Sequence, residues 1–154
     1  MVPANITIRE YRADDQPWFE QLNREWIERY FVMEPVDTAV LTDPDTHIIK
    51  PGGCILMAES RNEVAGTVAL KRVTDRVYEF TKMAVAKPYR GLKIGYALGE
   101  AALDRARSLK ASSVILYSHT SLAPAISLYK KMGFREIPLD GPYKRSDIKM
   151  EISL

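Results

Sequence analysis

The spacing of hydrophobic residues changes several times along the chain, and each change predicts a new element. Apolar and polar residues alternate through ITIREY, residues 6–11, which is typical of a short strand. Over residues 16–31 the apolar side chains recur every three or four positions, which predicts an amphipathic helix that ends before Pro35. Residues 34–53 are the least regular part of the chain, with room for a short helix in DTAVLTD.

From Gly53 the hydrophobic pattern takes the period of strands. Three strand-like runs follow one another, CILMAES, VAGTVALKRV and RVYEFTKMAV, and they predict an antiparallel meander whose first tight turn lies at residues 61–63. A helix is then expected over about residues 94–110, a strand over 112–118, and a second helix that has Pro124 in its first turn and stops at Gly133. FREIP and KRSDIKMEISL close the chain as two strands. The predicted order is β-α-α-β-β-β-α-β-α-β-β.

Composition and charge exclude several classes of protein. The 154 residues suit one domain, expected to span residues 1–154, and 46% apolar and 27% charged residues are typical of a globular chain. A net charge of +2 is too small to predict a nucleic-acid or membrane partner. The N-terminus lacks the pattern of a secretory leader, and no apolar run approaches the roughly 18 residues of a membrane span. We therefore expect a cytoplasmic protein.

The residues that most often bind metals are scarce. Cys54 is the single cysteine and lies in a strand-like run, where a small buried hydrophobe is expected more often than a reactive thiol. The two histidines, His47 and His119, are far apart in the sequence. Because no metal-ligand spacing results, no metal site is predicted.

The stretch PYRGLKIG, residues 88–95, carries the strongest chemical signal in the chain. It joins a predicted strand to a predicted helix, and Gly91 and Gly95 lie on either side of the junction. The free N–H groups and the dipole of a helix N-terminus favour an anion, and Arg90 and Lys93 add positive charge. The spacing fits neither the P-loop nor the dinucleotide-binding fingerprint. On these residues alone, a phosphate-binding loop and a simple tight turn remain equally good interpretations.

Three stretches together resemble the GCN5-related N-acetyltransferases. The family's pyrophosphate loop, [QR]-x-x-G-x-[GA], is similar to residues 90–95, RGLKIG, although Lys93 stands where the central glycine is usual. KMAV before the loop is similar to the family's bulged fourth strand, and LAPAISLYKKMGF, residues 122–134, to the helix and turn that close the cofactor cleft. The element order matches as well, whereas the first 50 residues match only in outline. Lysine is expected to be tolerated at position 93, at little cost if its φ is helical.

The resemblance implies a fold and a cofactor. The fold is an α/β (α+β) domain with a mixed, mostly antiparallel twisted sheet of six or seven strands and helices on both faces. Acetyl-CoA would lie where the fourth and fifth strands separate, and no metal is needed. The implied cofactor-binding residues are Met83, Ala84, Val85, Arg90, Gly91, Leu92, Lys93, Ile94, Gly95, Tyr96, His119 and Ile126.

The resemblance also implies two catalytic residues. Tyr129 matches the tyrosine of the family's A-x-x-x-Y pattern and would protonate the departing thiolate; the alternative is a core residue on the apolar stripe of its helix. Glu79, four residues before Met83, is the candidate base that deprotonates the amine. Period-two alternation places Glu79 and Met83 on one strand face. Ordered water is the alternative base, in which case Glu79 would be solvated or paired with a neighbour such as Lys71.

The acceptor site of the family lies between the first two helices and the loop joining the last two strands. The candidate substrate-binding residues there are Tyr30, Glu34, Tyr143 and Arg145. A carboxylate such as Glu34 suits an ammonium group, and Arg145 suits a carboxylate. This pair favours a small amino acid or a related amine.

The sequence thus predicts an N-acetyltransferase that moves an acetyl group from acetyl-CoA to a primary amine of a small molecule. The alternative is a regulatory module that binds acyl-CoA without catalysis, and Tyr129 argues against it. A nucleotide hydrolase or kinase is disfavoured because no Walker lysine or Mg²⁺-ligand set is in register. Strand edges at the C-terminus permit a homodimer without requiring one.

Overall fold

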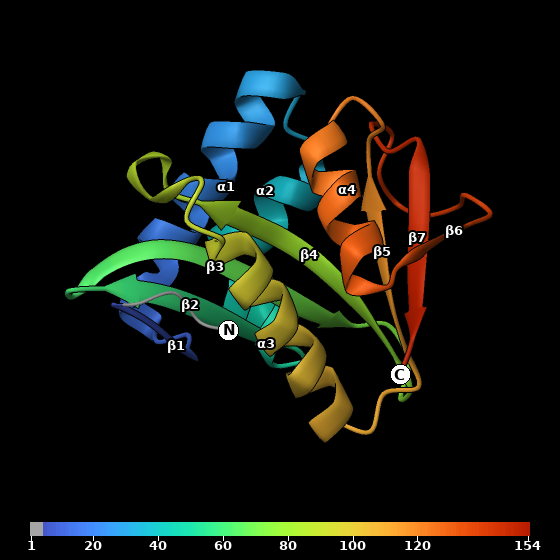
Figure 1. The fold of residues 1–154 in the computed structure, drawn as a ribbon, viewed down its shortest axis with the longest axis horizontal. Helices are drawn as coiled ribbons and strands as arrows, with labels where there is room; N and C mark the ends of the chain where they lie inside the picture. Colours follow the sequence, from blue (N-terminus) through green and yellow to red (C-terminus); the bar gives the residue numbers. More distant parts are fainter. Residues whose placement is uncertain (1–4) are drawn as a thin grey trace.

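A seven-stranded sheet in the order β1-β2-β3-β4-β5-β7-β6 organises the computed structural model, which describes residues 5–154 (Figure 1). Residues 1–4, part of the stretch on which the leader prediction rests, lie outside the described residues. All neighbouring strands are antiparallel except β4 and β5. The strands are β1 Ile6–Glu10, β2 Cys54–Ser60, β3 Glu63–Arg72, β4 Val77–Val85, β5 Ser113–Ser118, β6 Arg135–Ile137 and β7 Ile148–Ser153.

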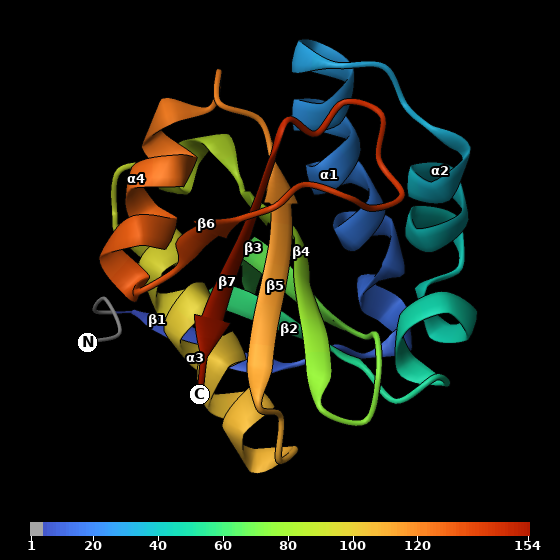
Figure 2. The same ribbon diagram turned by 90° about the vertical axis from the view of Figure 1, so that its right-hand side faces the viewer.

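Four α-helices cover the two faces of this sheet, α1 and α2 on one side and α3 and α4 on the other (Figure 2). The mixed sheet, the element order and the helices on both faces confirm the predicted fold. None of the helices between residues 5 and 154 combines the length and the apolarity needed to cross a membrane. The helices are α1 Gln16–Tyr30, α2 Pro35–Thr42, α3 Ile94–Ser108 and α4 Ala123–Met132; short helical turns lie at Ala13–Asp15, Asp45–Ile49 and Lys87–Tyr89.

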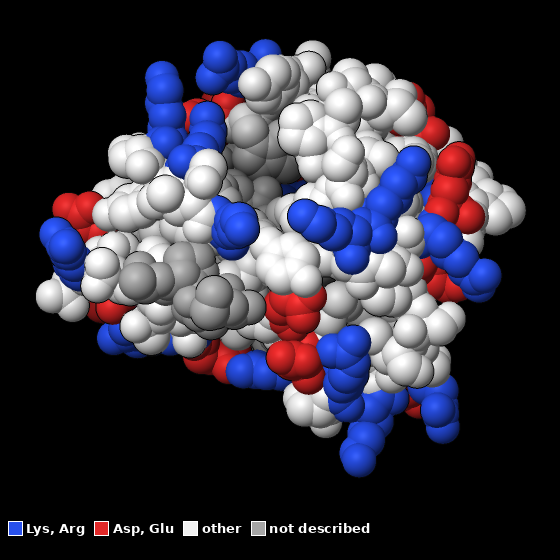
Figure 3. All heavy atoms as spheres, in the orientation of Figure 1, with Lys and Arg blue, Asp and Glu red and all other residues white. Residues whose placement is uncertain are grey.

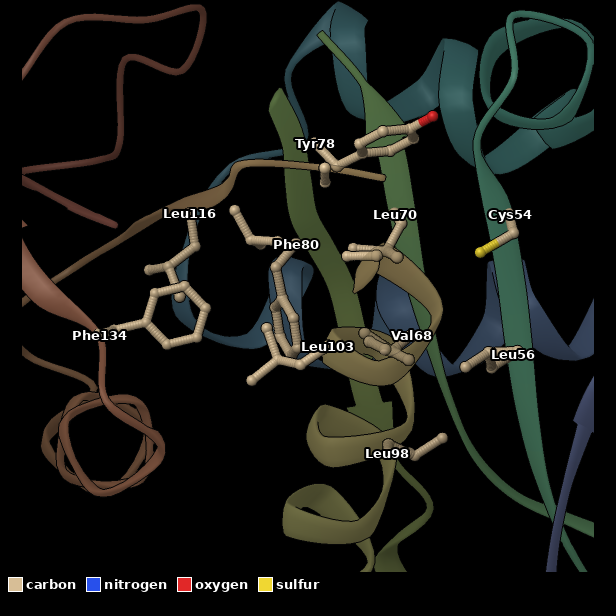
Figure 4. Packing of buried hydrophobic residues seen from close by; sticks show 14 of the residues in the cluster. Cys54, Leu56, Val68, Leu70, Tyr78, Phe80, Leu98, Leu103, Leu116 and Phe134 are labelled. Atoms are coloured by element: carbon tan, nitrogen blue, oxygen red, sulfur yellow. The ribbon is translucent and has the colours of Figure 1, made fainter. Parts of the chain in front are cut away.

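The core is divided by the sheet because successive strand residues point to opposite faces. On β2, Leu56 packs in the cluster that includes α3, and Ile55 packs in the cluster that includes α1 and α2. Figure 4 shows the α3 side, where Phe80 of β4 lies among side chains from α3, β3 and the segment after α4. The rings of Phe80 and Phe134 meet edge to face, with 6.0 Å between their centroids. Cys54 is buried as expected, and burial raises its pKa to about 11.

Strands β4 and β5 pair over a short stretch and then separate. Their parallel register covers only Val77↔Ser113, Tyr78↔Val114 and Glu79↔Ile115. Beyond Glu79, β4 continues alongside β3 to Val85, and β5 continues alongside β7 to Ser118. The facing edges of β4 and β5 therefore carry backbone groups that the sheet does not use.

A bulge at Lys82 changes which face of β4 each side chain occupies. The register with β3 shifts between Thr67, which faces Ala84, and Ala69, which faces Thr81, so one residue of β3 opposes two of β4. Lys82 takes a positive φ of 54° at this point. Met83 consequently packs in the α3-side cluster. The prediction that Glu79 and Met83 share a face is wrong, because simple alternation does not continue through a bulge.

Gly53 is required where the segment after the Asp45–Ile49 turn enters β2. A Cβ at this position would lie 2.2 Å from the carbonyl oxygen of Leu70 and 2.8 Å from that of Ile48. Both contacts are with backbone, so neither can be relieved by a side-chain rotation. We expect Gly53→Ala to lower the free energy of unfolding by about 1–3 kcal/mol, as measured by urea denaturation. Gly95→Ala is the control, because its Cβ would meet nothing closer than 3.7 Å. A Gly53→Ala protein as stable as the wild type would refute the close approach.

Candidate active site

The separation of β4 and β5 opens into a cleft of about 1070 Å³. Its lining comes from the C-terminal part of α1, from β4 and the loop after it, from the start of α3, from β5 and α4, and from the loop before β7. Figure 3 shows a hollow on this side of the molecule with Lys and Arg side chains near its rim. The volume is at the upper end of the range for sites that bind small molecules and cofactors.

The loop after β4 has the backbone of an anion-binding turn. Gly91 has a φ of +82°, and a Cβ there would meet nothing within 4 Å. The first helical hydrogen bond of α3 runs from the Ala97 N–H to the Lys93 carbonyl, at 3.1 Å. The amides of Ile94, Gly95 and Tyr96 therefore precede the hydrogen-bonded part of the helix and are directed out of its N-terminus. An anion placed there meets these N–H groups and the positive end of the helix dipole.

Lys93 occupies a left-handed backbone conformation. Its φ is 63° and its ψ is 22°, directly before the first residue of α3. The expectation that lysine costs little here depended on a helical φ and is wrong for that reason. A side chain with a Cβ in this region costs about 1–2 kcal/mol. The usual glycine of the related loop would avoid that cost, and in exchange Lys93 brings a positive charge to the lining of the cleft.

Arg90 is fixed at the edge of the same loop. Its Nε donates to the Val85 carbonyl at 3.1 Å, and its Nη2 pairs with Glu25 of α1 at 3.2 Å. Arg90 thus links the end of β4 to α1 across the mouth of the cleft. Leu92 is 52% exposed and does not line the cleft, so its side chain is not placed to contact a ligand.

The remaining predicted cofactor residues fall into two groups. Met83, Ala84 and Val85 line the cleft along the unpaired edge of β4, and His119 lines it at the end of β5. His119 Nδ1 accepts from the Ser121 N–H at 3.0 Å, and its Nε2 lies 3.5 Å from Asp147. Ile126 packs against the α3-side core and is not part of the lining.

Tyr129 lies on the wall of the cleft in an apolar setting. Its ring meets Phe80 and Phe134 edge to face, at 5.8 and 6.0 Å between centroids. Burial raises the pKa of its hydroxyl to about 12. Tyr129 therefore remains a neutral phenol at physiological pH and can donate a hydrogen bond into the cleft that it lines.

Glu79 is buried behind Tyr143 and does not itself line the cleft. Glu79 is 4% exposed, and its Oε2 accepts a hydrogen bond from the Tyr143 hydroxyl at 3.1 Å. Burial raises the pKa of Glu79, although the charge of Lys82 and the Tyr143 hydroxyl act in the opposite direction. Tyr143 does line the cleft, so its hydroxyl connects the buried carboxyl to the ligand space.

One buried carboxylate, Asp37 of α2, holds β4 and the loop before β7 together. It is fully buried, accepts from Arg145 Nη2 at 2.7 Å and pairs with Lys82 Nζ at 3.2 Å. It also caps α2 by accepting from the Glu34 N–H at 3.0 Å. Burial alone would raise the pKa of Asp37, but Arg145 and Lys82 outweigh it and the pKa is lowered.

Glu34 and Arg145 form an ion pair with each other. The Glu34 carboxylate accepts from the backbone N–H groups of Lys144 and Arg145 and from Arg145 Nη1 at 3.3 Å. Glu34 does not line the cleft, whereas Arg145 does. Glu34 therefore fixes the loop before β7 against α2, and this position does not suit the ammonium-binding role suggested by the sequence. Tyr30, the fourth candidate, is 57% exposed at the rim.

Sequence reasoning missed Lys82, the buried cation at the centre of this arrangement. Its side chain is only 2% exposed, and its residue lines the cleft. Burial lowers the pKa of Lys82, against the attraction of Asp37. A lysine directly before an apolar strand end, in TKMAV, is the available signal, but alternation assigns it to the face of Phe80 and not to the face where Asp37 lies. Within residues 5–154 no cluster of His, Cys, Asp and Glu is suited to a metal.

The comparisons with known proteins agree with the geometry. The Acetyltransferase (GNAT) family matches residues 10–134. IAA acetyltransferase of Azospirillum brasilense is 33% identical over 143 residues, which cover 90% of this chain and 90% of the relative. N-acetylaspartate synthetase of Xenopus tropicalis is 29% identical over 119 residues, which cover 74% of this chain and 44% of the relative. The structure of PaiA N-acetyltransferase from Thermoplasma acidophilum in complex with coenzyme A has a TM-score of 0.76 at 20% identity, covering 97% and 99% of the two chains.

The chain belongs to the GNAT acetyltransferase family. It spans only 35–50% of the length of several curated relatives, the N-acetylaspartate synthetases and N-acetyltransferase 8B among them. The structural likeness, at 20% identity, shows that the fold is shared.

Asp37→Asn tests whether the packing of β4 and the loop before β7 depends on the buried carboxylate. The variant leaves Lys82 and Arg145 buried without their shared anion, so the free energy of unfolding at pH 7 should fall by about 3–5 kcal/mol in urea denaturation. Because the folded-state pKa of Asp37 is lowered, its stabilisation is complete above the unfolded pKa of about 3.9 and is lost as the pH falls through the folded value. The difference in the free energy of unfolding between wild type and Asp37→Asn should therefore shrink as the pH is lowered below about 3.9.

Asp45→Asn is the matched control, because the Asp45 side chain is 58% exposed and, within residues 5–154, forms an ion pair with Lys50 alone. It should change the free energy of unfolding by no more than about 0.5 kcal/mol. An Asp37→Asn protein as stable as this control at pH 7 would contradict the role given to Asp37.

Proposed function

We propose that the protein transfers an acetyl group from acetyl-CoA to a primary amine of a small molecule. The observation that carries this proposal is the cleft where β4 and β5 separate, with the amides of the α3 N-terminus at one end. The pyrophosphate of CoA would bind the turn at residues 91–96, near Arg90 and Lys93. Pantetheine would lie between the strands and pair with backbone groups of Met83 and Val85 that the sheet does not use, as an added strand does, in competition with Arg90 Nε at the Val85 carbonyl.

Family membership and a coenzyme A complex of a structural neighbour support the choice of cofactor. The relative named N-acetylaspartate synthetase supports a small-molecule acceptor. No metal enters the proposal, because attack of an amine on a thioester needs only a neutral nucleophile, a polarised carbonyl and a stabilised leaving group.

The proposed reaction is direct attack. The amine nitrogen forms a bond to the thioester carbonyl carbon, and the oxygen takes up negative charge that a backbone N–H of the β4 edge would stabilise. The C–S bond then breaks, the nitrogen loses a proton, and the sulfur gains one. The products are the acetylated amine and the free thiol of CoA, so atoms and charges balance without a further reactant.

Tyr129 is the group we place at the departing sulfur. Its pKa of about 12 keeps the phenol protonated, but it also makes complete proton transfer to a thiolate of pKa about 8.5 unfavourable. Tyr129 therefore acts by donating a hydrogen bond as the C–S bond breaks. The proton lost by the nitrogen passes toward Glu79, and the sulfur takes up one proton from solvent, so Tyr129 stabilises the leaving thiolate without giving up its own proton.

Glu79 is the group we place behind the amine. Since Tyr143 stands between Glu79 and the cleft, the carboxylate would act through the Tyr143 hydroxyl or through water that replaces it in the ligand complex. The raised pKa of Glu79 brings it nearer to neutrality, where a general base works best.

Calorimetry with acetyl-CoA and a thiol-release assay with a panel of amines test the proposal. We expect saturable acetyl-CoA binding and CoA release that depends on the added amine. Gly95→Leu should weaken CoA binding at least tenfold, because its side chain would extend among Leu128, Met83 and Val85 in the cleft region. Ser108→Leu, an exposed position at the far end of α3, is the bulky control. Tight binding without turnover across a broad panel would favour a sensing module instead.

Tyr129→Phe separates chemistry from packing. Removing the hydroxyl should lower kcat about 10²–10³-fold while acetyl-CoA affinity changes little, because the hydrogen bond strengthens only as the thiolate leaves. Steady-state kinetics together with calorimetry measure the two effects. Tyr78→Phe, in the same core but outside the cleft lining, is the control for loss of a phenol. Equal losses of kcat and affinity in Tyr129→Phe would mean that Tyr129 only packs.

A further inference from the structure

The charged side chains that line the cleft are almost all basic. Among the described lining residues the single carboxylate is Glu25, and it pairs with Arg90 beside the anion-binding turn. The basic lining residues are Arg29, Lys82, Arg90, Lys93, Lys131 and Arg145. Arg90 and Lys93 belong to that turn. Arg29, Lys82 and Arg145 lie with the α1 end and the loop before β7, on the side that receives the acceptor.

Lys82 and Arg145 flank the ring of Tyr143. Lys82 Nζ lies 4.9 Å from the ring centroid, and the Arg145 guanidinium carbon lies 5.0 Å from it. Both distances are within the range of cation–π contacts. Both cations are anchored by Asp37, which is fully buried and is not part of the lining. A ligand beside Tyr143 therefore meets the two cations first and the carboxylate only behind them.

The acid groups near this point have little accepting capacity left for a ligand. Asp37 gives one oxygen to Lys82 and both to Arg145, and Glu34 is occupied by Arg145 and two backbone N–H groups. Glu79 accepts from Tyr143. The cations keep donors in reserve, since a lysine has three N–H groups and an arginine five. The two positive charges of Lys82 and Arg145 cancel the two negative charges of Asp37 and Glu34. A ligand still meets positive charge, because the two cations line the cleft and the two carboxylates do not.

Among the described lining residues the one carboxylate, Glu25, is already paired with Arg90 beside the anion-binding turn, so an ammonium group other than the reacting one meets no carboxylate beside Tyr143. A carboxylate on the acceptor, by contrast, would receive charge-assisted hydrogen bonds from Lys82 and from the free donors of Arg145. We propose that the acceptor carries a carboxylate close to its amine, and that Lys82 and Arg145 beside Tyr143 form the subsite that recognises it. Polyamines are disfavoured by the same groups. This inference rests on the proposed N-acetyl transfer and names its substrate class.

Product binding tests the subsite without requiring turnover. In the presence of CoA, calorimetry would compare N-acetylphenylalanine with its amide, with N-acetylphenethylamine and with N-acetylspermidine, which share the acetylated nitrogen and differ in charge. We expect N-acetylphenylalanine to bind at least tenfold more tightly than its amide. In a second series N-acetylaspartate is compared with its diamide, and a tenfold preference for the carboxylate compound in either series supports the subsite. Equal or weaker binding of the carboxylates in both series, or no binding by any of them, would overturn the proposal.

Variants assign the preference to its residues. Lys82→Met should remove most of the tenfold preference, and Lys130→Met, on an exposed position of α4 outside the lining, should retain it. If Lys82→Met does not fold, Arg145→Lys keeps a charge on the loop and loses the planar donors, so it should still reduce the preference. A preference that survives both substitutions would overturn the assignment of the subsite.

Initial rates of thiol release keep this proposal separate from the proposed function. Phenylalanine and aspartate would be compared with phenethylamine and spermidine as acceptors. Faster turnover of the two amino acids supports the subsite. Faster turnover of the amines without carboxylates would overturn it while leaving N-acetyl transfer intact, whereas no turnover with any acceptor, despite selective product binding, would count against the transfer and not against the subsite.

Discussion

The cleft exists because β4 and β5 pair over only three residues each before they separate. A sheet that closed at this point would leave no cleft, and the N-terminus of α3 would face another strand instead of open space. The bulge at Lys82 is part of the reason the strands diverge, because it rotates the end of β4 and shifts its register with β3. A lysine with a positive φ is in a strained backbone conformation, so other contacts must stabilise the bulge.

Asp37 supplies that restraint. Its ion pair with Lys82 ties the bulged strand to α2, and its bidentate contact with Arg145 ties the loop before β7 to the same point. Burying three charges is expensive unless every charge is paired, and here one carboxylate serves two cations. The end of β4, where the cofactor is proposed to bind, and the loop before β7, proposed to contact the acceptor, are thus joined through a single residue, which makes the geometry of one depend on the position of the other.

The two halves of the cleft use charge differently. The end of the cleft at the start of α3, where the cofactor is proposed to bind, offers backbone N–H groups, an arrangement suited to a diffuse anion such as pyrophosphate, with Arg90 and Lys93 at its edge. The side formed by β4 and the loop before β7, where the acceptor is proposed to bind, offers cations whose carboxylate partners lie behind them. The proposed chemistry uses a neutral phenol, Tyr129, and a buried carboxyl, Glu79, that is reached through Tyr143.

The sequence predicted the strands, the helices and the loop because hydrophobic spacing and glycine positions are local properties. It could not place Met83 on the correct face, since a bulge is decided by the neighbouring strand. Glu34 and Arg145 were recognised as a charged pair near the acceptor, but their mutual contact depends on a loop more than 100 residues from α2. Lys82 was missed for a similar reason, because only the folded chain brings it to Asp37.

A crystal structure of the protein with CoA would show whether the cofactor lies where β4 and β5 separate. We expect pyrophosphate oxygens within hydrogen-bonding distance of the amides at residues 91–96, pantetheine between β4 and β5, and the thiol close to the Tyr129 hydroxyl. A complex in which pyrophosphate binds elsewhere, or in which pantetheine lies outside the space between the two strands, would contradict it.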